Sequence, residues 1–565
     1  MITVRTTAAD AAASFRPLGL TRGLSLVSAD VWILALAVAI TLGLGLLALP
    51  RGEFPIHDET YYAGPAVRLA QTGALLLDEE IWASSVTLIT WGALALKLFG
   101  GGLVVLRCAM LALGVLCVLA FDALLRQLDF DRGPRALALT ALAVQPLFVS
   151  RSVSFMTEMP FELFVLTALA TGLAGLRQRQ LGLLAAAGGC AAAAFLTRQI
   201  GVLVVVALAV GVLGSPGLRK RWRPWLALLL PSIVVIAAFC WWRYGSSDPS
   251  LAAEPFVAAA DQWQQPRELL WELVLRLAHA MAYLGAFALP LLAAHSSRLP
   301  TYLRQLDGRG RLALAMGLVI GLASFGVAGQ QPLPYLGNAA HPLRGLVREM
   351  PLAVEAAIGH SVITGVACLF WGAGGLVLGL AFARWWQNGA RWWGHAHLPC
   401  YATGVLLLLA PLGAPVFYER YHFPLLPFAF VLCLVALRPL PIGRLPAAAV
   451  LTLCASLSIA FMIDKGQRAA VTWQAAEALV AEGVPPQTIE AGFEWTYWWQ
   501  FWDAYHSDPN RPVMIARKAL TMATYRVAFA PMPGYEVERT LPFSTPLTWG
   551  TQYVYLLRPS SRPVN

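Results

Sequence analysis

Charged residues are scarce in this sequence of 565 residues: Asp, Glu, Lys and Arg together make up 13%, about half the share found in soluble domains. Hydrophobic residues instead make up 58%, and the mean hydropathy is +0.63. Fixed-period repeats and low-complexity tracts are also missing. This composition excludes a soluble enzyme and an intrinsically disordered chain, and it predicts a protein built largely inside a membrane.

Cysteine gives no sign of a disulfide framework. Each of the eight cysteines lies in or at the end of an apolar run: Cys108, Cys117, Cys190, Cys240, Cys368, Cys400, Cys433 and Cys454. In such surroundings we expect a cysteine to act as a small core residue. A small secreted protein held together by disulfides is therefore excluded.

Apolar runs recur along the chain, and many are near the 20 or so residues that cross a bilayer as a helix. We place about 13 spans, near residues 29–50, 102–125, 136–150, 158–176, 181–197, 199–214, 224–243, 269–294, 312–329, 359–382, 400–416, 422–437 and 445–463. The first run is longer than the core of a signal peptide and lacks a convincing cleavage site, so we expect it to remain as an anchor. The predicted fold is a mainly α, polytopic helix bundle.

Positive charges mark alternate loops between these spans. The basic loops contain Arg126, Arg132 and Arg135; Arg177 and Arg179; Arg219, Lys220, Arg221 and Arg223; Arg298, Arg304, Arg309 and Arg311; Arg384 and Arg391; and Arg438 and Arg444. By the positive-inside rule these loops and the N-terminus face the cytoplasm, and an odd number of spans leaves the C-terminal tail outside. The formal net charge of +10 belongs to the membrane part, so no nucleic-acid partner is implied.

The chain divides into two predicted domains, a membrane domain at 1–463 and a small extracytoplasmic domain at 464–565. Long outer segments are expected at 51–100, with amphipathic helices in it, and at about 330–358. The tail combines a helical pattern near 469–482 with strand-like runs at 513–516, 525–530 and 553–557. This alternation predicts a small α/β or α+β fold.

A cluster of polar residues opens the first outer loop: His57, Asp58, Glu59, Thr60, Tyr61 and Tyr62. Adjacent carboxylates are unusual in a chain with so few charges. One of them could act as a general base toward an alcohol, while the tyrosine rings pack on a sugar face. The alternative interpretation is an interfacial loop of solvated acids and aromatic belt residues.

Two acids occur at the outer start of the fourth span, in the segment Met-Thr-Glu-Met-Pro-Phe-Glu. Glu158 and Glu162 are four residues apart, which puts both on one helix face. Glu158 could simply be an acid favoured at a helix N-terminus. Glu162 lies deeper in the apolar region, where a carboxylate normally faces a polar cavity or a partner.

Two arginines on the outer side are candidate phosphate ligands. Arg198 occupies a short turn between two apolar helices, against the topology bias, and its guanidinium offers paired donors to phosphate oxygens. Arg420 lies in the late cluster Glu419, Arg420, Tyr421 and His422. It is either a second phosphate contact or the ion-pair partner of Glu419.

Several common signals are absent. The sequence has no Gly-rich phosphate loop ending in Lys-Ser or Lys-Thr, no zinc-spaced Cys/His set and no serine-nucleophile elbow. The Asp129-Phe130-Asp131 triplet matches a metal-binding pattern of nucleotide-sugar transferases, but it falls in a predicted cytoplasmic loop. We interpret it as part of a solvated loop.

Together, the outer-face motifs resemble the GT-C membrane glycosyltransferases. The shared features are the Asp-Glu pair of the first outer loop, the acid at the start of the fourth span, the Leu-Thr-Arg turn and the Glu-Arg-Tyr-x-x-Pro-x-x-Pro segment. Within this group the sequence is most similar to glycosyltransferase family 39, which includes the aminoarabinose transferases and protein O-mannosyltransferases. The resemblance covers the chain to about residue 463.

This resemblance implies transfer of a sugar from a polyprenyl-phosphate donor to a lipid or protein acceptor, outside the cytoplasmic membrane and generally with inversion. It implies that Asp58 is the acid/base residue, with Glu59 beside it, and that Glu158 is a second active-site acid. Arg198 and Arg420 would then face the lipid phosphate. No cofactor follows with certainty, and a divalent metal stays an open alternative.

Two other function classes remain open from the residues alone. A transporter or lipid flippase could use Glu162 and other buried polar groups as a midplane site, although the paired, broken helices typical of transporters are missing from the sequence. A catalytically silent scaffold could use the tail to dock a partner. The sugar, the acceptor and the oligomeric state are not determined by the sequence.

Overall fold

A computed structural model describes residues 20–56, 58–77, 83–245, 266–328, 360–388, 397–410, 419–507, 524–547 and 550–560. The helices of this part of the chain are α1 (Leu20–Ala48), α2 (Glu59–Thr72), α3 (Val86–Phe99), α4 (Leu103–Gln127), α5 (Arg132–Val144), α6 (Pro146–Ser152), α7 (Glu158–Gln178), α8 (Leu181–Thr197), η1 (Gln199–Gly201), α9 (Val202–Gly214), α10 (Trp222–Tyr244), α12 (Pro266–Ala294), α13 (Leu299–Gln305), α14 (Gly308–Ala328), α16 (His360–Asn388), α17 (Leu398–Leu409), η4 (Glu419–Leu425), α18 (Leu426–Leu437), α19 (Arg444–Ala481), η5 (Pro486–Thr488) and α20 (Gly492–Ser507). The strands are β1 (Ile489–Glu490), β2 (Tyr525–Ala528), β3 (Tyr535–Phe543) and β4 (Gln552–Pro559).

The predicted helix bundle is confirmed. Within the described ranges, nine helices are long and apolar enough to cross a membrane, and four shorter apolar helices accompany them. One predicted span, at 136–150, is instead two short helices, α5 and α6. Gln145 between them is extended, with φ −69° and ψ 128°, because the ring of Pro146 disfavours a helical conformation in the residue before it.

Close packing within the bundle relies on small residues, as is typical of membrane helices. Helices α14 and α16 meet at Gly317, where an added Cβ would lie 2.4 Å from the carbonyl oxygen of Gly375. Helices α8 and α10 meet in the same way, since a Cβ on Gly188 would lie 2.1 Å from the carbonyl oxygen of Leu228. A side chain at either position would push the two helices apart.

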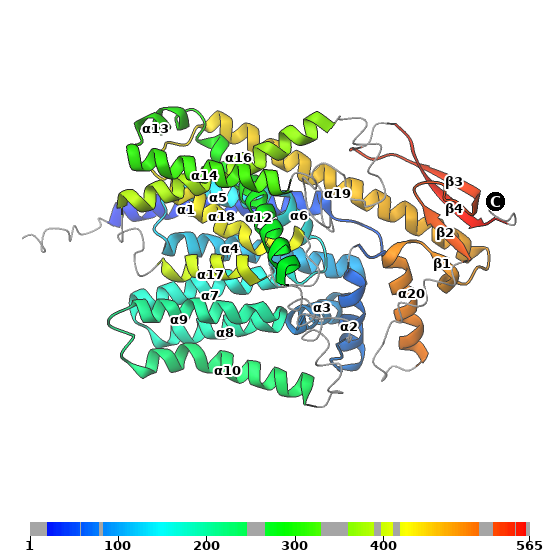
Figure 1. Cartoon of the computed structure of the whole chain (residues 1–565). Helices are drawn as coiled ribbons and strands as arrows, with labels where there is room; N and C mark the ends of the chain where they lie inside the picture. The colour runs from blue at the N-terminus through cyan, green and yellow to red at the C-terminus, as the bar shows by residue number, and fades with distance from the viewer. Residues whose placement is uncertain are drawn as a thin grey trace, which may run out of the picture.

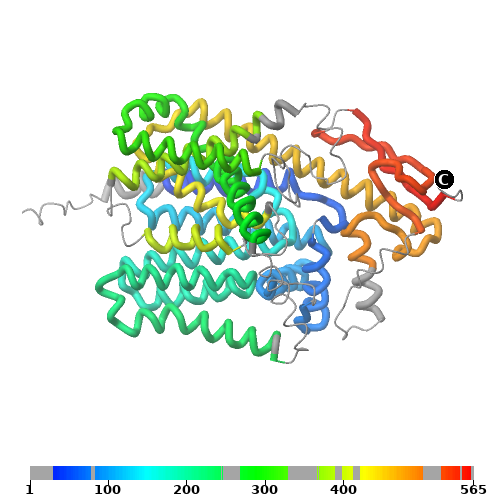
Figure 2. The backbone as a smooth tube through the Cα atoms, viewed as in Figure 1, coloured from blue at the N-terminus to red at the C-terminus, as the bar shows by residue number. Residues whose placement is uncertain are grey.

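The basic loops gather at one end of the bundle, as the alternation of charges predicts. Arg177, in the last turn of α7, pairs with Asp129, after α4, and one nitrogen–oxygen distance is 3.1 Å. The Nη2 of Arg438, after α18, donates to the carbonyl oxygen of Asp129 at 3.2 Å. Helices α2 and α3 and the C-terminal sheet lie toward the other end (Figures 1 and 2).

The C-terminal region is a small domain of helices packed on a four-stranded sheet, with strand order β1-β2-β4-β3. Strand β1 is parallel to β2, and the other pairs are antiparallel. The runs predicted at 525–530 and 553–557 correspond to β2 and β4, the run at 513–516 lies outside the described residues, and β3 was not predicted. Helix α19 continues unbroken from the bundle into this domain, through the position at which the sequence suggested a boundary.

The positive-inside argument predicts which end of the bundle faces outward. We expect a membrane-impermeant maleimide to label Glu482→Cys, in the C-terminal domain, on right-side-out membrane vesicles. The matched variant Lys220→Cys, in the basic loop between α9 and α10, should be labelled only after the vesicles are permeabilised, with the wild-type chain giving the background from its native cysteines. The opposite labelling pattern would show that the orientation is inverted.

Candidate active site

Four of the expected site residues meet at the end of the bundle near the C-terminal domain. Arg420 pairs through Nη1 with the Oδ2 of Asp58. Glu158 lies between two guanidinium groups, because its Oε1 is 3.9 Å from the Nε of Arg420 and 3.9 Å from the Nη2 of Arg198. These four residues, 362 positions apart at the extremes of the sequence, therefore form one charged cluster.

The cluster is largely sequestered from solvent. The side chain of Glu158 has no exposed area, and those of Arg420, Arg198 and Asp58 are 10%, 14% and 17% exposed. The charge of Arg151, also fully buried, acts on Glu158 as well. Three guanidinium groups therefore surround two carboxylates in a site of restricted water access, where charge interactions are stronger than in bulk water.

Two tyrosines complete this cluster. The guanidinium carbons of Arg198 and Arg420 lie 5.5 Å and 6.0 Å from the ring centre of Tyr421, within the usual range for a cation over an aromatic face. Tyr62 is buried among Asp58, Glu158 and the arginines. Burial raises the pKa of Tyr62 to about 12, so its phenol stays protonated near neutral pH and can donate a hydrogen bond.

The positions of the helix ends place these residues at the same end of the bundle. Asp58 immediately precedes α2, Glu158 is the first residue of α7, and Arg198 follows the last residue of α8. The turn at Arg198 is tied to the start of α3, because the backbone N–H of Ser85 donates to the carbonyl oxygen of Thr197 at 3.1 Å. Asp58, Glu158 and Arg198 thus all lie at helix ends.

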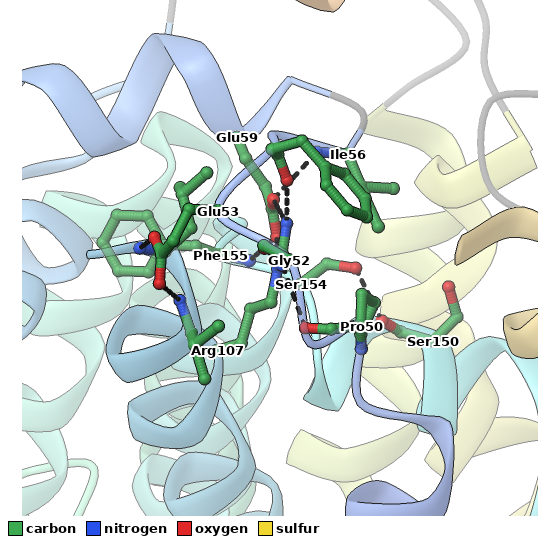
Figure 3. A network of polar contacts seen from close by, with 12 residues as sticks. Pro50, Gly52, Glu53, Ile56, Glu59, Arg107, Ser150, Ser154 and Phe155 are labelled. Atoms are coloured by element: carbon green, nitrogen blue, oxygen red, sulfur yellow. Dashed lines mark hydrogen bonds and ion pairs between the residues drawn. The ribbon is translucent and has the colours of Figure 1, made fainter. Parts of the chain in front are cut away.

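Glu59 follows Asp58 in the sequence but pairs with Arg107 instead of Arg420; Figure 3 shows Glu59 beside Arg107. The Nη2 of Arg107 is 2.7 Å from the Oε2 of Glu59, and Nε is 3.1 Å from Oε1, with both side chains fully buried. The Glu59 carboxylate also accepts hydrogen bonds from the backbone N–H groups of Ile56 and Phe155, each at 2.9 Å. Its oxygens are therefore occupied by structural contacts.

Arg107 ties the rest of the first outer loop to α4. Its Nη1 donates to the carbonyl oxygens of Pro50 at 3.0 Å and Gly52 at 2.8 Å. Nearby, the carboxylate of Glu53 accepts a hydrogen bond from the N–H of Leu103 at 2.6 Å, at the first turn of α4 (Figure 3). The segment that leads to Asp58 is consequently held at several points.

Three further expected site residues lie elsewhere, and one lies outside the described residues. The Tyr61 ring packs on Tyr497 of the C-terminal domain, at 4.0 Å between ring centres. Glu162 is buried within α7, and neither of its carboxylate oxygens has a hydrogen-bond partner among the described residues. Glu59 is engaged by Arg107, as described above, and His57 is the residue outside the described part.

An apolar cavity of about 820 Å³ lies between α12, α14, α16, α17 and α18. Its lining includes Leu277, Leu378, Val405 and Leu432. It reaches η4, because Leu425 lines it and because Tyr283, another lining residue, stacks on His422 with ring centres 4.1 Å apart. The cavity therefore adjoins the short helix that carries Arg420.

Arg107 and Arg151 are the site-supporting residues that the sequence reasoning missed. Both lie in or beside apolar runs, and a guanidinium in such a place normally has a partner or a function. That signal was available, whereas the identity of the partner was not. Among the residues that the structure describes, no three His, Cys, Asp or Glu side chains converge as metal ligands would.

Comparison with known families identifies one segment of the chain. Residues 88–242 match the family model of the dolichyl-phosphate-mannose-protein mannosyltransferases. The matched segment contains Glu158 and Arg198, whereas Asp58 and Arg420 lie outside it. No curated protein gives a significant match. The resemblance to a membrane glycosyltransferase family, predicted from the sequence, is confirmed over this segment.

The matches among solved structures are distant. ArnT from Cupriavidus metallidurans bound to undecaprenyl phosphate is 17% identical, with a TM-score of 0.42, over 93% of this chain and 98% of that chain. The apo state of ArnT is 15% identical, with a TM-score of 0.39, over 94% and 98%. An oligosaccharyltransferase from Archaeoglobus fulgidus, tethered with an acceptor peptide, is 14% identical, with a TM-score of 0.35, over 88% and 68%.

The buried pair of Glu59 and Arg107 predicts a large stability effect. Glu59→Gln keeps the shape of the side chain but leaves Arg107 as a buried charge without its counter-ion, so we expect a loss of about 3–5 kcal/mol. Thermal unfolding of the purified protein in detergent measures this. The control is Glu482→Gln, which removes an exposed pair with Arg539 and should change the stability by less than about 1 kcal/mol. Equal unfolding temperatures for the two variants would contradict the structural role of Glu59.

Proposed function

We propose that this protein transfers a sugar from a polyprenyl-phosphate donor to a lipid or protein acceptor at the outer face of the cytoplasmic membrane. The observation that carries the proposal is the cluster of Asp58, Glu158, Arg198 and Arg420 at one end of the bundle. It combines a candidate base with two candidate phosphate ligands. The family match over residues 88–242 supports the same reaction class.

The charges of the cluster suit a phosphate. Arg420 and Arg198 flank Glu158, and each guanidinium can present two parallel N–H donors to phosphate oxygens. Asp58 balances Arg420 when no donor is bound. A donor phosphate would compete with Asp58 for Arg420, and the carboxylate released in this way becomes available as a base.

The proposed step is a single displacement. Asp58 removes the proton of the acceptor hydroxyl as its oxygen forms a bond to the anomeric carbon. The bond from that carbon to the phosphate oxygen breaks, and the electron pair leaves with the polyprenyl phosphate, whose negative charge increases. Arg198 and Arg420 would stabilise this added charge in the transition state. Attack opposite to the leaving group inverts the anomeric centre.

The apolar cavity supports a lipid-linked donor. A polyprenyl chain is a long hydrocarbon. A preformed apolar cavity can enclose it, so that contacts with protein side chains take the place of contacts with water or with membrane lipid. The cavity adjoins η4, so a chain in it would bring its phosphate toward Arg420. A nucleotide sugar has no hydrocarbon tail to occupy such a cavity, and it is not expected outside the cell membrane.

Removal of the proposed base gives the most direct test. We expect Asp58→Asn to lower sugar transfer at least a thousandfold, because an amide cannot accept the hydroxyl proton. The assay follows labelled polyprenyl-phosphate mannose, and in parallel the corresponding pentose, with envelope lipids and proteins from cells that lack this chain as acceptors. Asp129→Asn, at the opposite end of the bundle, is the control. Undiminished transfer by Asp58→Asn would eliminate the assigned base.

Replacing the guanidinium groups tests the phosphate site. We expect Arg420→Gln and Arg198→Gln each to lower kcat/KM for the donor about ten- to a hundredfold, the range of one charged hydrogen bond. Both variants should also weaken the thermal stabilisation that polyprenyl phosphate gives to the protein. Arg177→Gln, which breaks a pair at the other end of the bundle, should leave both measurements unchanged. The same loss in all three variants would argue against a phosphate site at Arg420 and Arg198.

A further inference from the structure

Helix α20 of the C-terminal domain contacts the start of α2, three residues beyond Asp58. The Tyr61 ring lies against Tyr497, with centres 4.0 Å apart and planes at 55°, and against Phe493, with centres 5.5 Å apart. Ring pairs of this kind stabilise a contact beyond the apolar area they bury. The N–H of Tyr61 donates to the carbonyl oxygen of Asp58 at 3.1 Å, so a backbone hydrogen bond links the two residues directly.

A second contact lies on the other side of Asp58. Phe54 packs against the hydrophobic core of the C-terminal domain, and its ring lies 5.8 Å from the guanidinium carbon of Arg107. Trp498 of α20 packs against both that core and the core of the bundle. The C-terminal domain therefore contacts the chain on both sides of Asp58, at Phe54 and at Tyr61.

The C-terminal domain is joined to the bundle by a continuous helix. Helix α19 has 38 residues, about 57 Å at 1.5 Å per residue, and joins the bundle to the domain without a break. Helix α20 is anchored by Trp495, which is fully buried, lies 4.7 Å from the ring of Trp473 on α19 and donates to the carbonyl oxygen of Pro486. Figure 1 shows α20 alongside α2.

Charged residues occur at the same interface. Glu494 on α20 is close enough to Asp58 and Glu59 for their charges to act on it, and Lys465 on α19 acts in the opposite sense. Burial raises the pKa of the Glu494 carboxyl, and the two neighbouring acids raise it further. Acidic side chains of α20 and of the loop therefore lie near enough to influence one another, in addition to the aromatic contacts.

We propose that the C-terminal domain is part of the catalytic apparatus, and that Tyr497 and Phe493 are positioning residues that fix Asp58 through Tyr61. This inference rests on the proposed sugar transfer and adds a role that the membrane domain alone would not supply. A base must lie within hydrogen-bond reach of the proton that it removes, and a displacement of 1 Å can cost a hundredfold in rate. Removing the ring of Tyr497, which packs on Tyr61, leaves Arg198 and Arg420 in place but allows Asp58 to move from its position.

The test uses the full-length protein in lipid nanodiscs, with labelled polyprenyl-phosphate mannose as donor and envelope extract as acceptor. We expect Tyr497→Ala to lower kcat at least tenfold while KM for the donor changes less than threefold. Tyr497→Phe, which keeps the ring, should retain kcat within about twofold. The thermal stabilisation given by polyprenyl phosphate should be the same in both variants, because the phosphate ligands are unchanged.

The matched control is Phe529→Ala. Phe529 packs in the same domain against Phe543, with ring centres 5.7 Å apart, and it is not among the aromatic rings that contact Tyr61 in the described residues. It should lower domain stability as Tyr497→Ala does and leave kcat unchanged. Equal kcat in Tyr497→Ala and Phe529→Ala, or a loss confined to KM, would overturn the positioning role. If the wild-type chain transfers no sugar, the proposed function fails and the inference fails with it; a dependence on Asp58 without a dependence on Tyr497 overturns the inference alone.

Discussion

The buried pair of Arg107 and Glu59 is the interaction on which the arrangement of the site depends. A guanidinium in an apolar bundle is costly unless its donors are satisfied. Here Arg107 donates to the carboxylate of Glu59 and to backbone carbonyl oxygens of the first outer loop. Glu59 in turn accepts from the N–H of Phe155, three residues before Glu158. One ion pair therefore joins the loop that carries Asp58 to the turn that carries Glu158.

A network of this kind explains how a site can be built at a membrane surface from short motifs. Each charged residue of the site occupies a helix end, where the chain leaves the apolar region, and none is held by its sequence neighbours alone. The contacts that fix them are distant in sequence: Asp58 with Arg420, Ser85 with Thr197, and Tyr61 with Tyr497. The apolar helices supply the scaffold, and these few polar contacts determine where its charged side chains meet.

Much of the fold could be predicted because the bilayer imposes strong rules on sequence. Length and hydropathy identified the membrane helices, and the arginines identified which loops share an end. The break at Pro146 was missed because hydropathy does not register a local backbone restriction within an apolar run. Strand β3 was missed because its outward residues, such as Glu536 and Arg539, give it little apolar character.

The site could be predicted only as a set of residue types on one face. Asp58, Glu158, Arg198 and Arg420 attracted attention because charges are rare on the outer side, and the structure brings them together. The sequence could not separate Asp58 from Glu59, since both are carboxylates in the same loop. They differ because Asp58 precedes α2 and Glu59 is its first residue, so their side chains point to different partners. Glu59 pairs with Arg107, and Asp58 pairs with Arg420. Tertiary partners, rather than local pattern, distinguish them.

Pairing of Asp58 with Arg420 has a thermodynamic consequence for the proposed reaction. In the substrate-free chain the carboxylate of Asp58 is engaged by Arg420. A donor phosphate that binds Arg420 must displace Asp58, so the two anions compete for one guanidinium. By linkage, a change that weakens the pair of Asp58 and Arg420 strengthens the binding of phosphate. The base would then become available mainly when a donor is present. Because the phosphate gains negative charge as its bond to the sugar breaks, the same arginine interacts more strongly with the transition state than with the bound donor, which is the condition for an interaction to accelerate the step.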